Sequence, residues 1–357
     1  KPIGVWIMAF TSVDDPSIYF NTKLYTGNGS TQSITFDGSE NMKPDIVWVK
    51  QRNASNGGIQ YDSTRGANKK LDLNSNNAQD TQTDGLSSFD TDGFSTGAND
   101  AVNDGSDTYC TWNWNVGEGS TSSNSNGGIT STVQANTTAG ISILQFTGSG
   151  SNATVGHGLT AAPETFWIKN ISAGSTNRIS FWDALGGGKF LRQDTTDTAG
   201  TDSNMFNDTA PTSSVITVGT DSATNNSGST FNVVCIHSVQ GYCKVGSYTG
   251  VGSNDGAFIY TGFKPAFIYV KNHSTGSYKW IIQDNKRNLF NPRDKYIYPN
   301  ESEAEGESSN FNLDFYSNGF KPRNTRSETN DNNNKYVYLA IAESPQVNSK
   351  GVPNNAE

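Results

Sequence analysis

The sequence predicts an all-β protein built from three tandem β-sandwich units of about 100 residues each, jelly-roll-like in arrangement. Three observations lead to this prediction. The composition is poor in charge and rich in aromatic residues, short apolar runs alternate with Gly, Asn, Asp and Ser clusters, and one signature returns three times along the chain. Apolar runs rich in aromatic and β-branched residues fit a pleated surface, and the clusters between them fit turns.

The composition excludes several other classes of protein. Charged residues make up 17% of the 357 residues, against roughly a quarter in an average protein, and aromatic residues make up 11%. An acidic disordered chain would lack the aromatic residues, and a helical bundle would be rich in Ala, Leu, Glu and Lys. The net charge of −9 argues against a nucleic-acid partner, and no apolar run is long enough for a membrane span. The odd number of cysteines argues against a disulfide scaffold, so we expect buried thiols at Cys110, Cys235 and Cys243.

The repeated signature has the form aromatic-Thr-Gly-x-Gly-Ser and begins at Tyr25, Phe146 and Tyr248. Its two glycines predict a tight turn that needs positive φ, because no helix pattern follows for a phosphate-binding loop. Each copy leads to a proline that opens an apolar strand ending in lysine, and the same spacing separates Pro and Lys in all three copies. These strands are residues 44–50, 163–169 and 265–271.

Later elements keep the same register. An aspartate follows at Asp62, Asp183 and Asp284, and each unit closes on an apolar strand, at residues 109–114, 231–236 and 336–341. The strand after Pro44 lacks alternation, which is typical of a strand covered on both faces. Trp48 and Trp167 occupy one repeat position, and this recurrence predicts that both are buried in a core.

The repeats divide the chain into segments. We expect an arm at residues 1–19, β-sandwich repeats at 20–115, 140–240 and 241–343, a flexible linker at 116–139, and a tail at 344–357. The linker is rich in Gly and Ser and lacks the apolar residues that a core requires. Only a few residues separate the second and third repeats, so we expect those two to pack as one body. Met8 is typical of a natural start, and we expect residues 1–7 to be an upstream extension.

Several segments together are typical of one known family. They are residues 8–17, 24–30, 44–50, 62–66, 88–94, 154–159, 165–169, 207–214, 260–265, 318–320 and 347–356. On these segments the sequence resembles a family of proteins from marine tailed phages that are often labelled tail-fibre or virion structural proteins. The resemblance covers nearly the whole chain from Met8 onward. The departures are the residues before Met8 and the second repeat, which lacks the Asp-Gly-Phe found at Asp92.

The resemblance implies a setting on the virion exterior, after assembly in the host cytoplasm. We expect a virion surface structural protein, a tail-fibre or receptor-binding component that contacts host-surface glycan. A capsid decoration or head-fibre protein is the first alternative, and a glycan-degrading enzyme is the second. We expect contacts with other virion proteins through the N-terminal arm, where Trp6 and Phe10 lie, and a homo-oligomer such as a trimer.

The candidate binding residues are aromatic side chains with carboxylates beside them. A sugar-binding platform uses exposed aromatic faces with polar donors alongside, although recurrence also fits core packing. We expect no catalytic residues, no metal and no cofactor. The three histidines lack ligand spacing, and nothing pairs carboxylates such as Glu40, Asp45 and Glu164 across a cleft. The candidate carbohydrate-binding residues are Trp112, Trp114, Trp182, Asp183, Trp280 and Asp284.

Overall fold

A computed structural model describes residues 11–355 of the protein. Strands dominate it, and its α-helices span only four residues each. The all-β class predicted from the sequence is therefore confirmed. The short helices are α1 (Asp100–Asn103), α2 (Ser203–Phe206) and α3 (Ser222–Asn225), with 3₁₀ turns at Pro16–Ile18, Asp183–Leu185 and Ser309–Phe311.

The first unit, residues 20–115, pairs a larger sheet with a smaller one. The larger sheet has the order β1-β9-β3-β4-β5-β6, and the smaller has the order β2-β8-β7. The strands are β1 (Phe20–Thr26), β2 (Gln32–Ile34), β3 (Ile46–Gln51), β4 (Ile59–Asp62), β5 (Gly66–Asp72), β6 (Asp80–Thr81), β7 (Leu86–Asp90), β8 (Gly93–Thr96) and β9 (Thr108–Trp114).

The second unit, residues 122–240, repeats this plan. Its larger sheet has the order β10-β11-β12-β19-β14-β15-β16-β17, and β13 pairs with β18 in the smaller one. The strands are β10 (Ser122–Asn124), β11 (Ser131–Asn136), β12 (Ile141–Thr147), β13 (Ala153–Gly156), β14 (Thr165–Asn170), β15 (Ile179–Trp182), β16 (Lys189–Arg192), β17 (Gly200–Thr201), β18 (Val215–Val218) and β19 (Thr230–Ile236).

The third unit, residues 241–345, has sheets of order β20-β28-β22-β23 and β21-β27-β26, with a β24–β25 ribbon. The four-strand order β1-β9-β3-β4 thus recurs as β12-β19-β14-β15 and as β20-β28-β22-β23. The strands are β20 (Cys243–Thr249), β21 (Ile259–Tyr260), β22 (Phe263–Asn272), β23 (Ile281–Asp284), β24 (Lys295–Tyr296), β25 (Gly306–Glu307), β26 (Leu313–Tyr316), β27 (Gly319–Pro322) and β28 (Lys335–Pro345).

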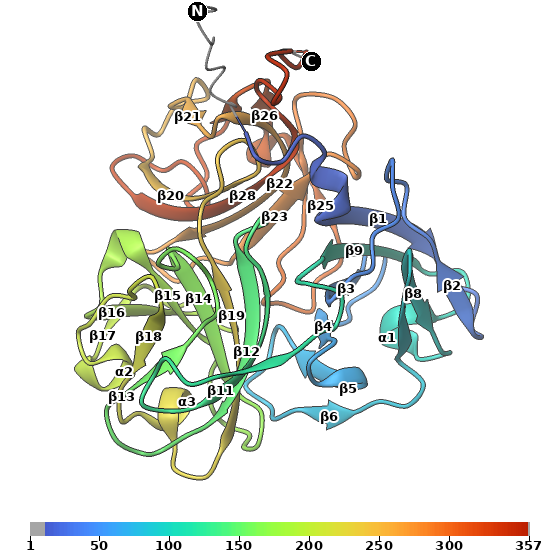
Figure 1. The fold of residues 1–357 in the computed structure, drawn as a ribbon. Helices are drawn as coiled ribbons and strands as arrows, with labels where there is room; N and C mark the ends of the chain where they lie inside the picture. The colour runs from blue at the N-terminus through green and yellow to red at the C-terminus, as the bar shows by residue number, and fades with distance from the viewer. Residues whose placement is uncertain (1–10, 356–357) are drawn as a thin grey trace, which may run out of the picture.

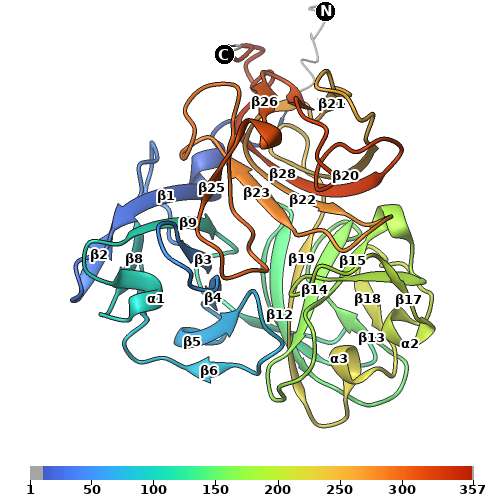
Figure 2. The same cartoon turned by 180° about the vertical axis from the view of Figure 1, so that it is seen from behind.

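The three units lie as lobes around a common centre (Figure 1), and the view from behind shows the same arrangement (Figure 2). Each larger sheet is covered on both faces. In β3, Trp48 points into a core shared by all three units, while Val47 and Val49 point into the first unit's own core. The missing alternation in this strand therefore correctly predicted double burial. The second and third units pack together in this shared core, as expected, and the first unit contributes to it as well.

Three aromatic side chains from one repeat position meet at the centre. The ring centroids of Trp48 and Trp167 lie 5.1 Å apart, and Tyr269 lies 5.9 Å from the first ring and 6.2 Å from the second. Their exposed fractions are 1%, 3% and 1%. The prediction that Trp48 and Trp167 are buried equivalents is confirmed.

The glycines of the repeated signature have two separate roles. The first glycine lets two backbone segments meet, since a Cβ on Gly27 would lie 2.0 Å from the carbonyl oxygen of Asp104. Gly148 and Gly250 stand in the same relation to Asn226 and Asp331, at 2.2 and 2.3 Å. The second glycine of each copy has a positive φ of 63 to 73°, which confirms the predicted turn.

The predicted linker is wrong over much of its length. β11 pairs with β12 along six residues and β10 pairs with β11, so residues 122–136 extend the second unit's sheet. Backbone hydrogen bonds to an exposed sheet edge hold this segment, and they need little apolar side-chain area. Val133 is also buried, and the amide oxygen of Gln134 accepts a hydrogen bond from Ser63 of the first unit at 3.0 Å.

The described part of the arm packs on the body of the same chain. Val13 is buried in the shared core, and the Thr11 hydroxyl donates to the carbonyl of Gln240 at 2.9 Å. The tail meets the arm where the backbone N–H of Ser349 donates to the Asp14 carboxylate at 2.7 Å. Trp6 and Phe10 of the expected arm, and the proposed extension at residues 1–7, lie outside the described residues.

The lysine that ends each apolar strand joins two units. Lys50, Lys169 and Lys271 are buried, and each ammonium donates to a carbonyl in its own unit and to another in a neighbouring unit. The own-unit acceptors are Asn56, Thr176 and Tyr278. The acceptors across the junctions are Ser302 for Lys50 at 3.1 Å, Asn76 for Lys169 at 3.0 Å and Thr196 for Lys271 at 2.8 Å. The contacts run cyclically from the first unit to the third, the third to the second and the second to the first.

These lysines should make stability rise with pH. Burial lowers the pKa of Lys50 and Lys169 to about 8 and that of Lys271 to about 7. A lysine in the unfolded chain titrates near pH ~10.4. Between these values the unfolded chain binds more protons, so the free energy of unfolding should increase with pH above about 7. Urea unfolding measured from pH 7 to about 9.5 tests this, and Lys271→Met should flatten the early part of the rise. A wild-type stability that falls over this range would contradict the assignment.

Candidate functional site

The predicted aromatic platform is not on the surface. Trp112, Trp182 and Trp280 are 0% exposed, and Trp114 is 2% exposed. Their rings pack in the shared core, where Trp182 and Trp280 of neighbouring units lie 6.0 Å apart. A buried ring has no free face for a sugar, so the assignment of these four residues to carbohydrate binding is wrong. Their recurrence reflected core packing.

Asp284 is also buried, and its contacts are structural. Its carboxylate accepts from the Trp112 indole N–H at 3.1 Å and from Arg287 Nε at 2.6 Å. Burial alone would raise the pKa of Asp284, but the Arg287 guanidinium and the N–H donors hold it below its ordinary value. The structure therefore brings Trp112 and Asp284 together as a link between the first and third units.

Asp183 is exposed, and the expectation that it is the repeat counterpart of Asp62 and Asp284 is wrong. The strand pairing places Trp182 at the position of those two aspartates. Asp62 and Asp284 each bind an arginine three residues later, Arg65 and Arg287, at 2.6 Å. In the second unit the residues at these two positions are Trp182 and Leu185. The second unit thus has two apolar residues in place of the aspartate–arginine pair, and it departs here from the threefold pattern.

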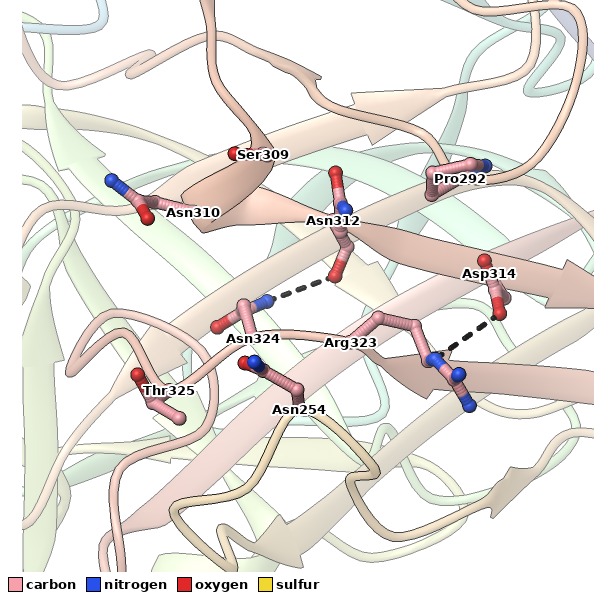
Figure 3. A pocket seen from close by; sticks show the side chains of 9 residues that line it. All are labelled: Asn254, Pro292, Ser309, Asn310, Asn312, Asp314, Arg323, Asn324 and Thr325. Carbon is pink, nitrogen blue, oxygen red and sulfur yellow. Dashed lines mark hydrogen bonds and ion pairs between the residues drawn. The ribbon is translucent and has the colours of Figure 1, made fainter.

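A polar hollow in the third unit is the strongest candidate site (Figure 3). Its volume is about 460 Å³, and four of its lining side chains are asparagines. The walls come from the loop before β21, the loop before β24, the 3₁₀ turn before β26, and the segment after β27. The lining residues are Asn254, Pro292, Ser309, Asn310, Asn312, Asp314, Arg323, Asn324 and Thr325.

Several amides in this hollow have no partner within the described residues. The Asn324 side chain donates to the carbonyl of Asn312 at 2.9 Å and is held in place. The side chains of Asn254, Asn310 and Asn312 make no hydrogen bond in the described part of the chain. Each of the three therefore offers one donor group and one acceptor to a ligand.

The charges around the hollow are balanced. Arg323 lies 3.6 Å from Asp314, and its Nη1 donates to Asp255 at 2.9 Å (Figure 3 shows the pair with Asp314). Lys321 contacts Asp255 at 2.6 Å. The site thus has no strong net charge and suits a ligand rich in hydroxyl groups.

Exposed apolar side chains border the same region. In the described part of the chain, every strongly exposed large apolar residue belongs to the third unit or the tail. Val251 is on the loop that carries Asn254, and Phe290, which is 76% exposed, is two residues before Pro292. The full set is Val251, Phe258, Tyr260, Leu289, Phe290 and Val352.

Sequence reasoning missed this hollow because asparagine is abundant throughout the chain. One sequence feature could have indicated the hollow. It is the pair Leu289-Phe290, which stands in an otherwise polar loop just before Pro292. An apolar pair in a turn-rich segment has no core to enter, which favours a surface contact.

Other predicted features have structural roles. The three cysteines are free and buried, as expected. His157 Nδ1 accepts from the backbone N–H of Leu159 at 3.1 Å and stabilises a turn. Residues 11–355 contain no group of three His, Cys, Asp or Glu side chains placed to hold a metal ion. No helix among these residues is long and apolar enough to cross a membrane.

Comparison with known proteins places the chain in a family. No curated protein sequence matches it. A family model described as "Domain of unknown function (DUF7483)" matches residues 15–345, which include all three units. The chain therefore belongs to the DUF7483 family.

Proposed function

We propose that this protein is a virion surface structural protein of a tailed phage, a tail-fibre or receptor-binding component whose third unit binds host-surface glycan. The observation that carries the proposal is the hollow of about 460 Å³, in which three amides have no hydrogen-bond partner among residues 11–355 and which exposed apolar loops border. The resemblance to marine tailed-phage virion proteins supplies the setting.

The chemistry of the hollow fits a neutral saccharide. Sugar hydroxyls both donate and accept hydrogen bonds, and an amide side chain can satisfy both roles at once. A sugar also has apolar C–H faces that pack on aromatic rings, and Phe290 offers such a ring. The balanced charges of Asp314 and Arg323 add further polar groups without demanding a charged ligand.

Binding is favoured over glycan hydrolysis. Glycosidases use two carboxylates that flank the scissile bond, and the lining of the hollow includes one, Asp314. The oxygens of this carboxylate are engaged within the protein, since it lies beside Arg323 and accepts a hydrogen bond from Tyr316 at 3.1 Å. Capsid decoration remains the alternative placement, since a decoration protein would use the same binding unit.

Attachment to other virion proteins is part of this proposal. The arm from Thr11 to Tyr19 packs within the chain, so an anchor formed by the arm would use residues 1–10. Assembly as a homo-oligomer would present several copies of the third unit together, which raises avidity for a repetitive surface glycan.

Asn254→Ala should weaken glycan binding by about tenfold, because the loss of a hydrogen bond to a neutral ligand has roughly this effect. The matched control is Asn152→Ala. Both residues lie four positions after the first glycine of their signature, but Asn152 donates to Asn207 at 2.8 Å within the second unit. The wild type is first screened against neutral oligosaccharides to find those that bind. Calorimetry then measures the affinity of both variants for these oligosaccharides. Equal affinities for the two variants, or no wild-type binding to any glycan, would contradict the proposed site.

A further inference from the structure

The three junctions between units share one backbone hydrogen bond, which allows them to be compared position by position. In each junction, the carbonyl two residues after the buried lysine accepts an N–H from the neighbouring unit. Glu305 donates to Arg52 at 2.8 Å, Gln79 to Ile171 at 3.2 Å, and Ala199 to His273 at 3.1 Å. Glu305 and Ala199 therefore occupy equivalent positions, facing Arg52 and His273.

At the junction of the first and third units, the two facing charges neutralise each other. The Arg52 guanidinium binds the Glu305 carboxylate through two nitrogens, each at 2.9 Å. The junction of the second and third units has a basic residue at the equivalent position, His273, but Ala199 replaces the glutamate. The carboxylate that neutralises one junction is missing from the other.

A hollow of about 630 Å³ lies at this second junction, and its charged lining residues are all basic. The ammonium groups of Lys189 and Lys335 make no ion pair or hydrogen bond within the described residues, and His273 lies with them. Five hydroxyl side chains also line the hollow, and no carboxylate does. The lining residues are Ala184, Leu185, Lys189, Thr198, Ala199, Ser247, Tyr248, Thr249, His273, Ser274 and Lys335.

The positive field in the hollow acts on His273. Burial, and to a smaller extent the charges of Lys189, Lys335 and Lys271, lower the pKa of His273 to about 4. At neutral pH the imidazole is uncharged and can donate one N–H, while the two lysines carry the charge. Such a concentration of unpaired positive charge is unusual in a chain with a net charge of −9.

The walls of the hollow are held before any ligand arrives. Lys271 donates across the junction to Thr196, two residues before Thr198, at 2.8 Å. The backbone N–H of Lys335 donates to the Ser274 hydroxyl at 2.8 Å, and Lys335 pairs with Thr249 in the sheet. Fixed walls reduce the ordering cost of binding.

We propose that this hollow binds the anionic group of an acidic saccharide. Lys189 and Lys335 would neutralise a carboxylate or phosphate, and His273 and the hydroxyls would bind the oxygens around it. The inference rests on the proposed glycan-binding function and extends it, because it assigns a charged sugar to a second site apart from the amide-lined hollow.

The test uses the full chain and three probes, a galacturonic acid tetramer, a glycerol phosphate oligomer and neutral maltotetraose. Lys189→Gln combined with Lys335→Gln should weaken binding of the acidic probe by tenfold or more, on the order expected for two charge-assisted contacts. Ala199→Glu should have the same effect, since it restores the carboxylate found at Glu305. Lys286→Gln, which removes an exposed lysine outside the hollow, should bind as the wild type does.

The probes distinguish the two sources of anionic group. Binding of the galacturonic acid tetramer alone would assign a carboxylate, and binding of the glycerol phosphate oligomer alone would assign a phosphate. The inference would be overturned if the wild type bound neither acidic probe, or if the double lysine variant bound the acidic probe as well as the wild type does. Neutral glycan binding that depends on Asn254 would survive that result, so failure of this inference is separable from failure of the proposed function. Thermal unfolding of each variant checks that the fold is retained.

Discussion

Replacing Trp167 with alanine should lower the free energy of unfolding by about 3–5 kcal/mol, the usual cost of a large aromatic truncation in a core. The ring is 3% exposed and contacts Trp48 and Tyr269, one residue from each other unit. Its loss opens a cavity where all three units meet and no single unit can repack alone.

Chemical denaturation followed by circular dichroism measures this change. Phe290→Ala is the control, since that ring is 76% exposed and its removal should change stability by less than about 0.5 kcal/mol. A double-mutant cycle of Trp167→Ala with Trp48→Ala should be non-additive, because the two rings are in contact. A Trp167→Ala variant as stable as the control would show that the centre is not a cooperative core.

Arg287→Met should destabilise the protein by about 3–5 kcal/mol, because it leaves the buried Asp284 carboxylate without its cation. Arg287 binds that carboxylate at 2.6 Å and also donates to the carbonyl of Ile282 at 2.9 Å. Methionine fills much of the same volume, so the loss is mainly electrostatic. Arg192→Met is the control, since its pair with Asp197 is partly exposed and should contribute about 0–1 kcal/mol.

The pH dependence of the Arg287→Met variant tests the cause. Without Arg287, burial would raise the pKa of Asp284 above its unfolded value near ~3.9. The folded variant would then bind the extra proton, and its stability should recover as the pH falls toward ~4. In the wild type the pKa of Asp284 is lowered, so this carboxylate adds stability that is lost as the pH falls. If the difference in free energy of unfolding between the wild type and the variant stayed constant between pH 4 and 7, that result would contradict a buried unpaired charge at Asp284.

The repeats predicted the all-β fold and the double burial of the strand that carries Trp48, because both depend on local patterns. The repeats could not reveal what covers the face of each larger sheet that points away from the core of its own unit. Trp112 on a strand face has the same sequence signal whether it meets a sugar or another unit, and the structure shows the second. β11 was missed for a different reason, since backbone hydrogen bonds to a sheet edge leave little trace in side-chain composition.

The candidate sites were hidden in a related way. Asn254 and Asn310 are ordinary residues in an asparagine-rich chain, and only the fold brings them to one hollow. The change from Glu305 to Ala199 is visible in the sequence, but the two positions are separated by more than a repeat and align only through the junction hydrogen bonds.

The cyclic junctions also bear on how a chain of this kind can diversify. A symmetric trimer of identical single-unit subunits would carry any substitution at all three junctions at once. Here the three junctions are encoded by separate stretches of one chain, so each can change alone. One junction holds the Arg52–Glu305 pair, another places Ile171 beside Gln79, and the third has His273 and two lysines around an open hollow. Joining the units in one polypeptide thus keeps a common core while it frees a single junction for recognition.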